Sequence, residues 1–234
     1  MQVRLLFDKE AQEPGLKTGW GVSFLIGGKV LFDTGENGDW LIGNMEKLGV
    51  DFDKIEAVVI SHDHWDHTGG LWKVLEKKKM PVYGCAGFSR EFKKQVKKSG
   101  CEFIECKKVT PIIDDVYATG EISGLYFGRG IAEQAVVIKS EKRISVLTGC
   151  SHPGIVKIAK YVRSKFPESD FYFIGGGFHL MQKDKREIRI IASELKKMQI
   201  VKAGPTHCSG KSAEEIFKAE FGDNFVSIRV GQRL

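Results

Sequence analysis

Long hydrophobic runs are missing from this 234-residue chain. No stretch approaches the roughly 18 uninterrupted apolar residues that a membrane-spanning helix requires. The N-terminal segment MQVRLLFDKE carries charges where a secretory signal needs a longer apolar stretch. We therefore expect a protein that does not cross a membrane, and we expect it in the cytoplasm.

Cysteine is scarce, and the five cysteines form no CxxC pair; they are Cys85, Cys101, Cys106, Cys150 and Cys208. An odd number without paired spacing argues against a disulfide framework and against a structural zinc ribbon. Cys150 and Cys208 each lie close to a histidine in the sequence. We expect them to be buried free thiols, with direct metal ligation as the alternative.

A strong acidic or basic imbalance is also missing, although the net charge of +6 and the pI near 9.0 would suit an anionic partner. Much of the excess lies in the segment FSREFKKQVKKSG, where Phe88, Phe92 and Val96 recur at helical spacing. The lysines of this segment fall on the opposite face, which is typical of a solvated amphipathic helix. No RNA-binding signature with interleaved aromatics accompanies it, so we do not expect a nucleic-acid partner.

No linker divides the chain, and we predict one domain over residues 1–234 with mixed α/β structure. Residues 1–35 read as strands, with Gly27 and Gly28 suiting a hairpin turn. Residues 80–135 are the least legible and could form an insertion or lid. From residue 135 strands and helices alternate, and the last helix opens with Ser212 and Glu215 in capping-box spacing.

The six histidines all lie where a predicted strand gives way to a helix. In layered α/β folds these junctions share the carboxyl edge of a sheet, which is where ligands bind. Four loops that are distant in sequence should therefore meet. The histidines are His62, His64 and His67 after strand 55–60, His152 after strand 143–149, His179 after strand 170–176, and His207 after strand 200–204.

The stretch SHDHWDHTGG indicates a metal site. His62 and His64 are separated by one residue, so in an extended segment both point to the same side and can share one metal. Asp66 and His67 follow after the chain has turned and would serve a second centre. Imidazole and carboxylate ligands suit zinc, with iron and manganese as alternatives. We therefore predict two divalent metal ions about 3.5–4 Å apart.

HDHWDH has the H-x-H-x-D-H pattern of the metallo-β-lactamase superfamily, and LFDTG, SHDHWDHTGG, GCSHPG and PTHC occur in the order that this superfamily uses. The chain resembles the superfamily from about Phe24 to Cys208. The resemblance implies a four-layered αβ/βα sandwich with the site in a shallow groove between two sheets. It also implies two ligand sets, which are His62, His64 and His152 for one metal and Asp66, His67 and His207 for the other.

The resemblance further implies that Asp33 hydrogen-bonds to the ligand loop and orients it; the alternative is an ordinary turn aspartate. One departure concerns the carboxylate that bridges the metals in many branches, because the loop here reads GGGFHL and places His179 at that position. His179 would then be a ligand or a proton donor to the leaving group. GCSHPG, GGFHL and PTHCSG together resemble the branch of metal-dependent hydrolases that contains the dihydropterin ribofuranosylaminobenzene phosphate synthase.

These observations predict a hydrolase in which a metal-bound hydroxide attacks a phosphoester or a related electrophilic bond, with Asp66, His179 and Asp33 as catalytic residues. A small anionic or phosphorylated substrate is expected, since the last helix and Lys211 could hold a phosphate. The alternative is the transferase reaction of the pterin synthase. Two further classes of protein stay open, an RNA-processing protein and a non-catalytic metal-binding module. The oligomeric state does not follow from the sequence.

Overall fold

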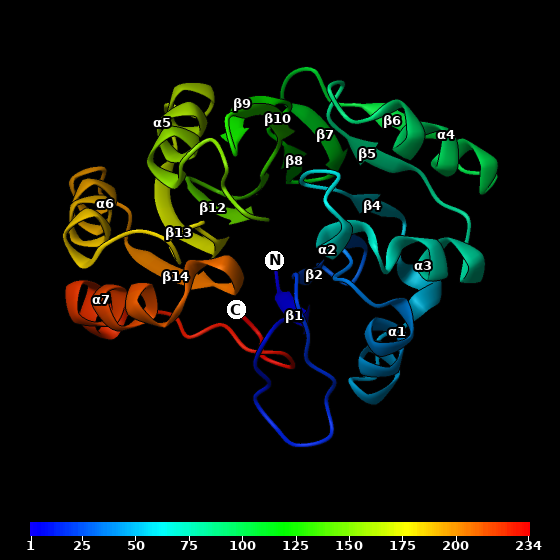
Figure 1. The fold of residues 1–234 in the computed structure, drawn as a ribbon, viewed down its shortest axis with the longest axis horizontal. Coiled ribbons are helices and arrows are strands. Elements are labelled where there is room, and N and C mark those ends of the chain that lie inside the picture. The colour runs from blue at the N-terminus through cyan, green and yellow to red at the C-terminus, as the bar shows by residue number, and fades with distance from the viewer.

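Two β-sheets packed face to face form the centre of the protein, and helices cover the outer face of each (Figure 1). The computed structural model describes residues 1–234. The arrangement is the predicted four-layered αβ/βα sandwich. None of its helices combines the length and apolar character that crossing a membrane demands.

The first sheet contains six strands in sequential order. Its strands are β1 (Val3–Phe7), β2 (Ser23–Ile26), β3 (Val30–Phe32), β4 (Ala57–Val59), β5 (Val82–Gly84) and β6 (Phe103–Glu105). The first three are antiparallel, whereas β3 to β6 run parallel. Gly27 and Gly28 form the predicted turn between β2 and β3, and both have positive φ. The helices of this half are α1 (Gly38–Lys47), α2 (Trp65–Thr68), α3 (Leu71–Lys77) and α4 (Arg90–Lys98).

The second sheet also has six strands, in the order β14-β13-β12-β11-β8-β7. Its strands are β7 (Thr110–Ile113), β8 (Val116–Ala118), β11 (Val136–Ser140), β12 (Arg143–Thr148), β13 (Asp170–Gly177) and β14 (Lys202–Thr206). The last three run parallel. Its helices are α5 (Ile155–Lys165), α6 (Lys185–Lys197) and α7 (Lys211–Phe221). A separate hairpin consists of β9 (Ile122–Tyr126) and β10 (Arg129–Glu133).

Three apolar clusters hold the layers together. One lies between the first sheet and its helices, one between the second sheet and its helices, and one between the two sheets. Neighbouring strand residues serve different clusters because side chains alternate across a strand. Val58 packs toward the helices, whereas Val59 packs between the sheets. Burial on both faces explains why the central strands are continuous apolar runs.

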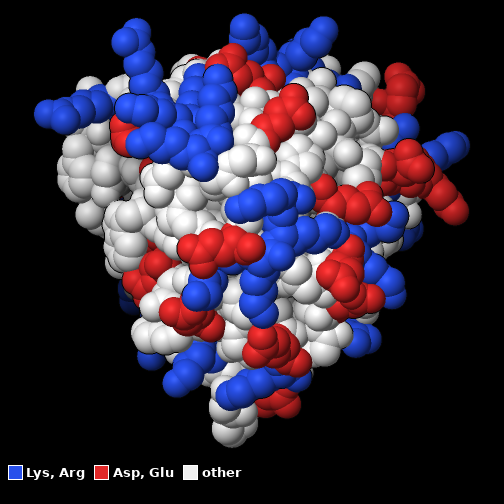
Figure 2. Space-filling model, turned by 90° about the vertical axis from the view of Figure 1, so that its right-hand side faces the viewer, with Lys and Arg blue, Asp and Glu red and all other residues white.

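The lysine-rich segment forms the predicted amphipathic helix, α4. Phe92 and Val96 are buried, whereas Lys94, Lys97 and Lys98 are exposed. Lys93 instead pairs with a carboxylate of β6. Basic and acidic side chains are intermixed over the face of the molecule that carries α4 (Figure 2).

The structure defines one region that the sequence left unresolved and corrects one local prediction. Residues 80–135, which the sequence pattern left unresolved, contain α4 and strands β5 to β10. The capping box predicted at the start of the last helix is wrong, because the N-cap of α7 is Gly210, two residues before Ser212, and it provides no side-chain cap. Gly210 has a φ of 79°, so the backbone turns into the helix before Ser212, which lies inside its first turn.

Candidate metal centre

The carboxyl ends of the parallel strands from both sheets meet at one place, and the polar residues of the sequence motifs follow these ends. Asp33 follows β3, and the HDHWDH segment follows β4 and continues into α2. The remaining residues follow the strands of the second sheet, with His152 after β12, His179 after β13 and His207 after β14. The six histidines therefore converge as expected.

The backbone at four of these strand ends adopts the left-handed region. Asp33, Ser151, His179 and His207 have φ values of 56°, 65°, 54° and 51°. Residues other than glycine seldom adopt this conformation, and strained positions of this kind cluster at functional sites. Each turn ends the strand sharply, so the adjacent side chains face the edge where the loops meet.

His62, His64 and His152 form the first cluster, with ligand atoms within 4.8 Å of one another. The ring centroids of His62 and His152 are 4.7 Å apart, and those of His64 and His152 are 5.0 Å apart. Burial and the neighbouring imidazoles hold the pKa of His62 well below its usual range. Burial and His152 also lower the pKa of His64. Both rings are thus neutral near pH 7, as metal ligation requires.

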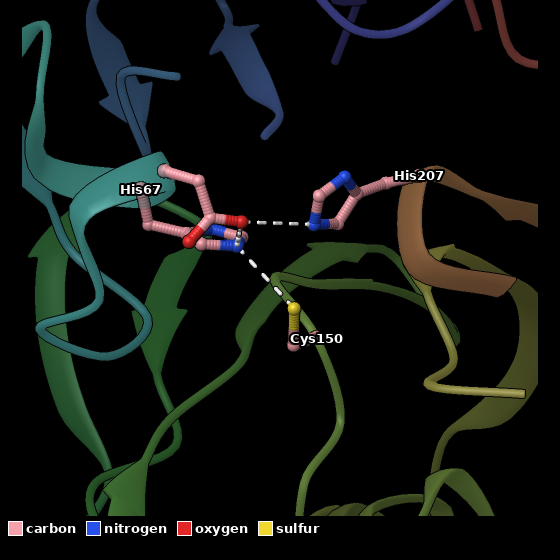
Figure 3. Close-up of side chains that lie close together, drawn as sticks. His67, Cys150 and His207 are labelled. Carbon is pink, nitrogen blue, oxygen red and sulfur yellow. Dashed lines mark hydrogen bonds and ion pairs between the residues drawn. The ribbon is translucent and has the colours of Figure 1, made fainter. Parts of the chain in front are cut away.

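Asp66, His67, Cys150 and His207 form the second cluster, again with ligand atoms within 4.8 Å of one another (Figure 3). Asp66 Oδ2 lies 3.3 Å from both His67 Nε2 and His207 Nε2. Burial opposes the charge of Asp66, but the two imidazoles outweigh it and keep the pKa of this carboxyl well below its usual range. Asp66 is therefore ionised at neutral pH.

Asp33 is in contact with a histidine of each cluster, directly with His67 and through Ser61 with His62. It is fully buried, and its Oδ2 lies 2.6 Å from His67 Nδ1. The same carboxylate accepts a hydrogen bond of 2.6 Å from the Ser61 hydroxyl, which in turn lies 2.8 Å from His62 Nδ1. One carboxylate thus holds the Nδ1 side of a histidine of each cluster. The Nε2 atoms of His62 and His67 are therefore left to bind a metal.

Glu133, the last residue of β10, contacts His152 as Asp33 contacts His67. The sequence did not predict this residue as part of the site. Its carboxylate accepts hydrogen bonds from the backbone N–H groups of Cys150, Ser151 and His152, at 2.6–3.0 Å, and lies 2.8 Å from His152 Nδ1. Burial raises its pKa, but His152 and the N–H groups lower it more, so the net shift is downward. Glu133 belongs to none of the sequence motifs, so only its contacts in the folded chain identify it.

The backbone near His207 depends on a glycine. The Gly21 N–H donates to His207 Nδ1 at 3.2 Å, and Gly21 has a φ of 104°. A side chain at this position would collide with the backbone carbonyl of Asp66. Only glycine lets the two segments of chain approach so closely.

The residues present fit divalent metal ions. His62 Nε2 is buried without any hydrogen-bond partner, and His207 Nε2 is buried with only the Asp66 carboxylate beside it, at 3.3 Å and outside hydrogen-bond geometry. A buried nitrogen without a hydrogen bond costs free energy unless a ligand satisfies it. Both histidines belong to clusters of imidazole, carboxylate and thiol groups, which is the donor set of zinc sites. The first cluster supplies three candidate ligands and the second supplies four.

His179 lies beside these clusters, near Cys150 and His152. Its ring centroid is 4.6 Å from that of His152. A hydrogen bond with Cys208 raises the pKa of His179 despite its partial burial. The ligand atoms of His179 are grouped with only one histidine of the first cluster, so it lies at the periphery of the candidate centre.

A cavity of about 360 Å³ opens over the clusters. His64, His152, His179 and His207 lie on its floor, and no lysine or arginine lines it. Its mouth carries large apolar side chains that are unusually exposed; they are Trp65 (62%), Leu125 (70%), Phe127 (77%) and Met181 (55%). Tyr126 packs near His64 inside, at 4.7 Å between ring centroids. Lys211, an expected anion-binding residue, is not part of this lining.

Comparison with known proteins agrees with these features. The sequence model of the metallo-beta-lactamase superfamily matches residues 21–176. One relative from Methanocaldococcus jannaschii is 7,8-dihydropterin-6-methyl-4-(beta-D-ribofuranosyl)-aminobenzene-5'-phosphate synthase, with 27% identity over 91% of this chain and 88% of the relative. An uncharacterized protein of the same organism is 29% identical over 87% of each chain.

Solved structures resemble the whole chain. Tm1679, a metal-dependent hydrolase of the beta-lactamase superfamily, has a TM-score of 0.83 and 28% identity, and the match covers 100% of this chain and 98% of Tm1679. A diphosphatase from the PhnP family has a TM-score of 0.61 at 16% identity, covering 100% of this chain and 96% of the diphosphatase. The second similarity shows the shared fold alone.

Proposed function

This chain belongs to the metallo-beta-lactamase superfamily, and from that premise we propose that it is a hydrolase that requires two divalent metal ions and cleaves a phosphoester or a related electrophilic bond in a small anionic molecule. The observation that carries the proposal is the pair of adjacent histidine-rich clusters on the floor of one cavity. One loop of the first sheet, after β4, and two loops of the second sheet, after β12 and β14, supply them.

One metal would be held by His62, His64 and His152, and the other by Asp66, His67 and His207. Zinc is the first choice for this donor set, with iron and manganese as alternatives. Divalent metals bound there would supply Lewis acidity, which activates water near neutral pH and stabilises negative charge on a phosphoryl oxygen.

Asp33 and Glu133 would be the positioning residues. Their carboxylates hold the Nδ1 sides of His67 and His152 at 2.6 and 2.8 Å. Asp66 is ionised, so it suits metal ligation better than proton transfer. His179 faces the cavity and Cys208 raises its pKa, so its imidazole can carry the proton that a leaving oxygen requires.

The cavity also limits the substrate. Since no lysine or arginine lines it, the charge of an anionic substrate would be balanced at the metal centre. The exposed Trp65, Leu125 and Phe127 at the mouth suit an apolar or planar group. We propose a substrate that carries an anionic ester at one end and an apolar or aromatic group at the other.

The apolar mouth also favours a second candidate function, the transferase reaction of the pterin synthase that is 27% identical to this chain. A flat pterin ring would stack on the aromatic side chains at the mouth. The two functions differ in the product, since hydrolysis releases an alcohol or phenol, whereas the synthase reaction joins two substrates.

One experiment tests the proposal. Metal-loaded protein is offered a panel of aromatic and aliphatic phosphomonoesters and phosphodiesters, and in parallel the two substrates of the synthase. We expect turnover of at least one aromatic ester, and His64→Ala should abolish it because the first cluster loses a ligand. The control variant Glu168→Gln, exposed and remote, should keep the wild-type rate. Unchanged turnover in His64→Ala would contradict the proposal, and conjugation without ester cleavage would favour the synthase reaction.

A further inference from the structure

Cys150 differs from three of the other cysteines in its surroundings. Cys85, Cys101 and Cys106 belong to the apolar clusters of the sandwich and pack as small hydrophobic residues. Cys150 is equally buried, with 4% of its surface exposed, yet it belongs to none of these clusters. Its surroundings are polar, so apolar packing does not account for its position.

The Cys150 thiol points toward the other members of the second cluster (Figure 3). Its Sγ lies 3.3 Å from His67 Nε2 and within 4.8 Å of the ligand atoms of Asp66 and His207. It also lies within 4.8 Å of the ligand atoms of His152 and His179. The sulfur therefore lies at the second candidate metal position, and Cys150 lines the cavity.

The backbone fixes the sulfur in this place. The Cys150 N–H donates to the Glu133 carboxylate at 3.0 Å, and Glu133 also receives the next two N–H groups of the loop. The Cys208 thiol donates to the Cys150 carbonyl at 3.6 Å. The same carboxylate that orients His152 thus orients Cys150, which is the arrangement expected of neighbouring ligands on one loop.

We propose that Cys150 is a ligand of the second metal, bound as a thiolate, and that it completes the set of Asp66, His67 and His207. This inference rests on the proposed metal centre. The set then has four protein donors, the usual number for tetrahedral zinc. When the metal binds, the Cys150 S–H bond breaks, the sulfur keeps the electron pair and forms the S–metal bond, and the proton goes to solvent.

A thiolate at Cys150 makes the two metal positions unequal in charge. Three neutral imidazoles in the first cluster leave the full charge of a divalent ion, whereas the Asp66 carboxylate and the Cys150 thiolate neutralise the ion in the second. An anionic substrate would therefore be attracted to the first position. A thiolate also selects zinc, cobalt or cadmium over magnesium and manganese.

Cobalt(II) titration tests the proposal by absorption spectroscopy, without reference to activity. Metal-free protein, freshly reduced and freed of reductant, receives cobalt up to two equivalents, and the near-ultraviolet thiolate-to-cobalt charge-transfer band is followed. We expect an intense band that accompanies one equivalent only. Cys150→Ser should lose the band and keep the equivalent bound by the first cluster, whereas the matched variant Cys208→Ser should keep the band.

X-ray absorption of the wild-type zinc protein guards against a variant that fails to fold. It should show one Zn–S path at about 2.3 Å per two zinc ions. Two bound cobalt ions without a charge-transfer band, or a band that survives in Cys150→Ser, would overturn the proposal and leave the metal-dependent hydrolase intact. Failure to bind cobalt at all would overturn both.

Discussion

Replacing Glu133 by glutamine removes one charge and keeps the shape of the side chain, so it isolates the role of the carboxylate beneath His152. In the wild type, Oε1 accepts from the N–H groups of Cys150 and Ser151 at 3.0 and 2.6 Å. Oε2 receives the His152 N–H at 2.7 Å and lies 2.8 Å from His152 Nδ1. Glutamine has only one acceptor oxygen, so its NH₂ group must face two donors.

The magnitude follows from these contacts. Hydrogen bonds to a charged group contribute about 1.5–3 kcal/mol each, so losing two would lower the free energy of unfolding by about 3–6 kcal/mol. The lower end is expected, since a neutral amide is cheaper to bury than a carboxylate. The freed His152 ring should also weaken metal affinity by about 10–100-fold, as replacement of residues that orient metal ligands commonly does.

Urea denaturation of the metal-free protein measures the first effect, and competition with a chromophoric zinc chelator measures the second. Glu168→Gln makes the same charge change at an exposed position and should alter stability by no more than about 0.5 kcal/mol. Glu133→Gln with wild-type stability and wild-type zinc affinity would refute the positioning role of this carboxylate.

Two further predictions concern groups at the edge of the site. Burial raises the pKa of Asp8 to about 6. Between about pH 4 and 6 the folded chain therefore binds more protons than the unfolded chain. Raising the pH through this window should lower the free energy of unfolding by about 3 kcal/mol. In metal-free Asp8→Asn, urea denaturation at pH 4 and pH 7.5 should lack this decrease; an equal decrease in both proteins would contradict the assignment. Phe127→Ala should raise KM about 5–10-fold for an aromatic substrate, by the worth of one ring contact, and leave KM for an aliphatic one unchanged; equal effects on both would argue against stacking.

The layered fold could be predicted from the sequence because its signals are local. Apolar runs such as residues 55–60 and the stripe on α4 report burial directly, and the resemblance of HDHWDH and the later motifs supplied the sandwich. The capping box at Ser212 failed because a glycine with positive φ, Gly210, starts α7 by backbone conformation alone. A pattern of capping side chains cannot predict a helix start that depends on backbone conformation.

The convergence of the histidines was predictable for a similar reason, since strand ends of a parallel sheet share an edge. Glu133 was not predictable, because it lies on the β9–β10 hairpin and reaches His152 only through the tertiary fold. Tyr126 and Phe127 belong to the same hairpin and line the cavity for the same reason, so they were not predictable either. Cys150 was visible in the sequence, but its polar surroundings, which separate it from the cysteines of the apolar clusters, were not.

Elemental analysis of gently purified protein, without added chelator, measures directly whether the two clusters hold metal ions. We expect two equivalents of a divalent metal per chain, with zinc preferred, and a melting temperature that falls when a chelator removes them, because ligands that bind only the folded state stabilise it. Fewer than one equivalent, together with a melting temperature that neither chelation nor added zinc changes, would contradict this expectation.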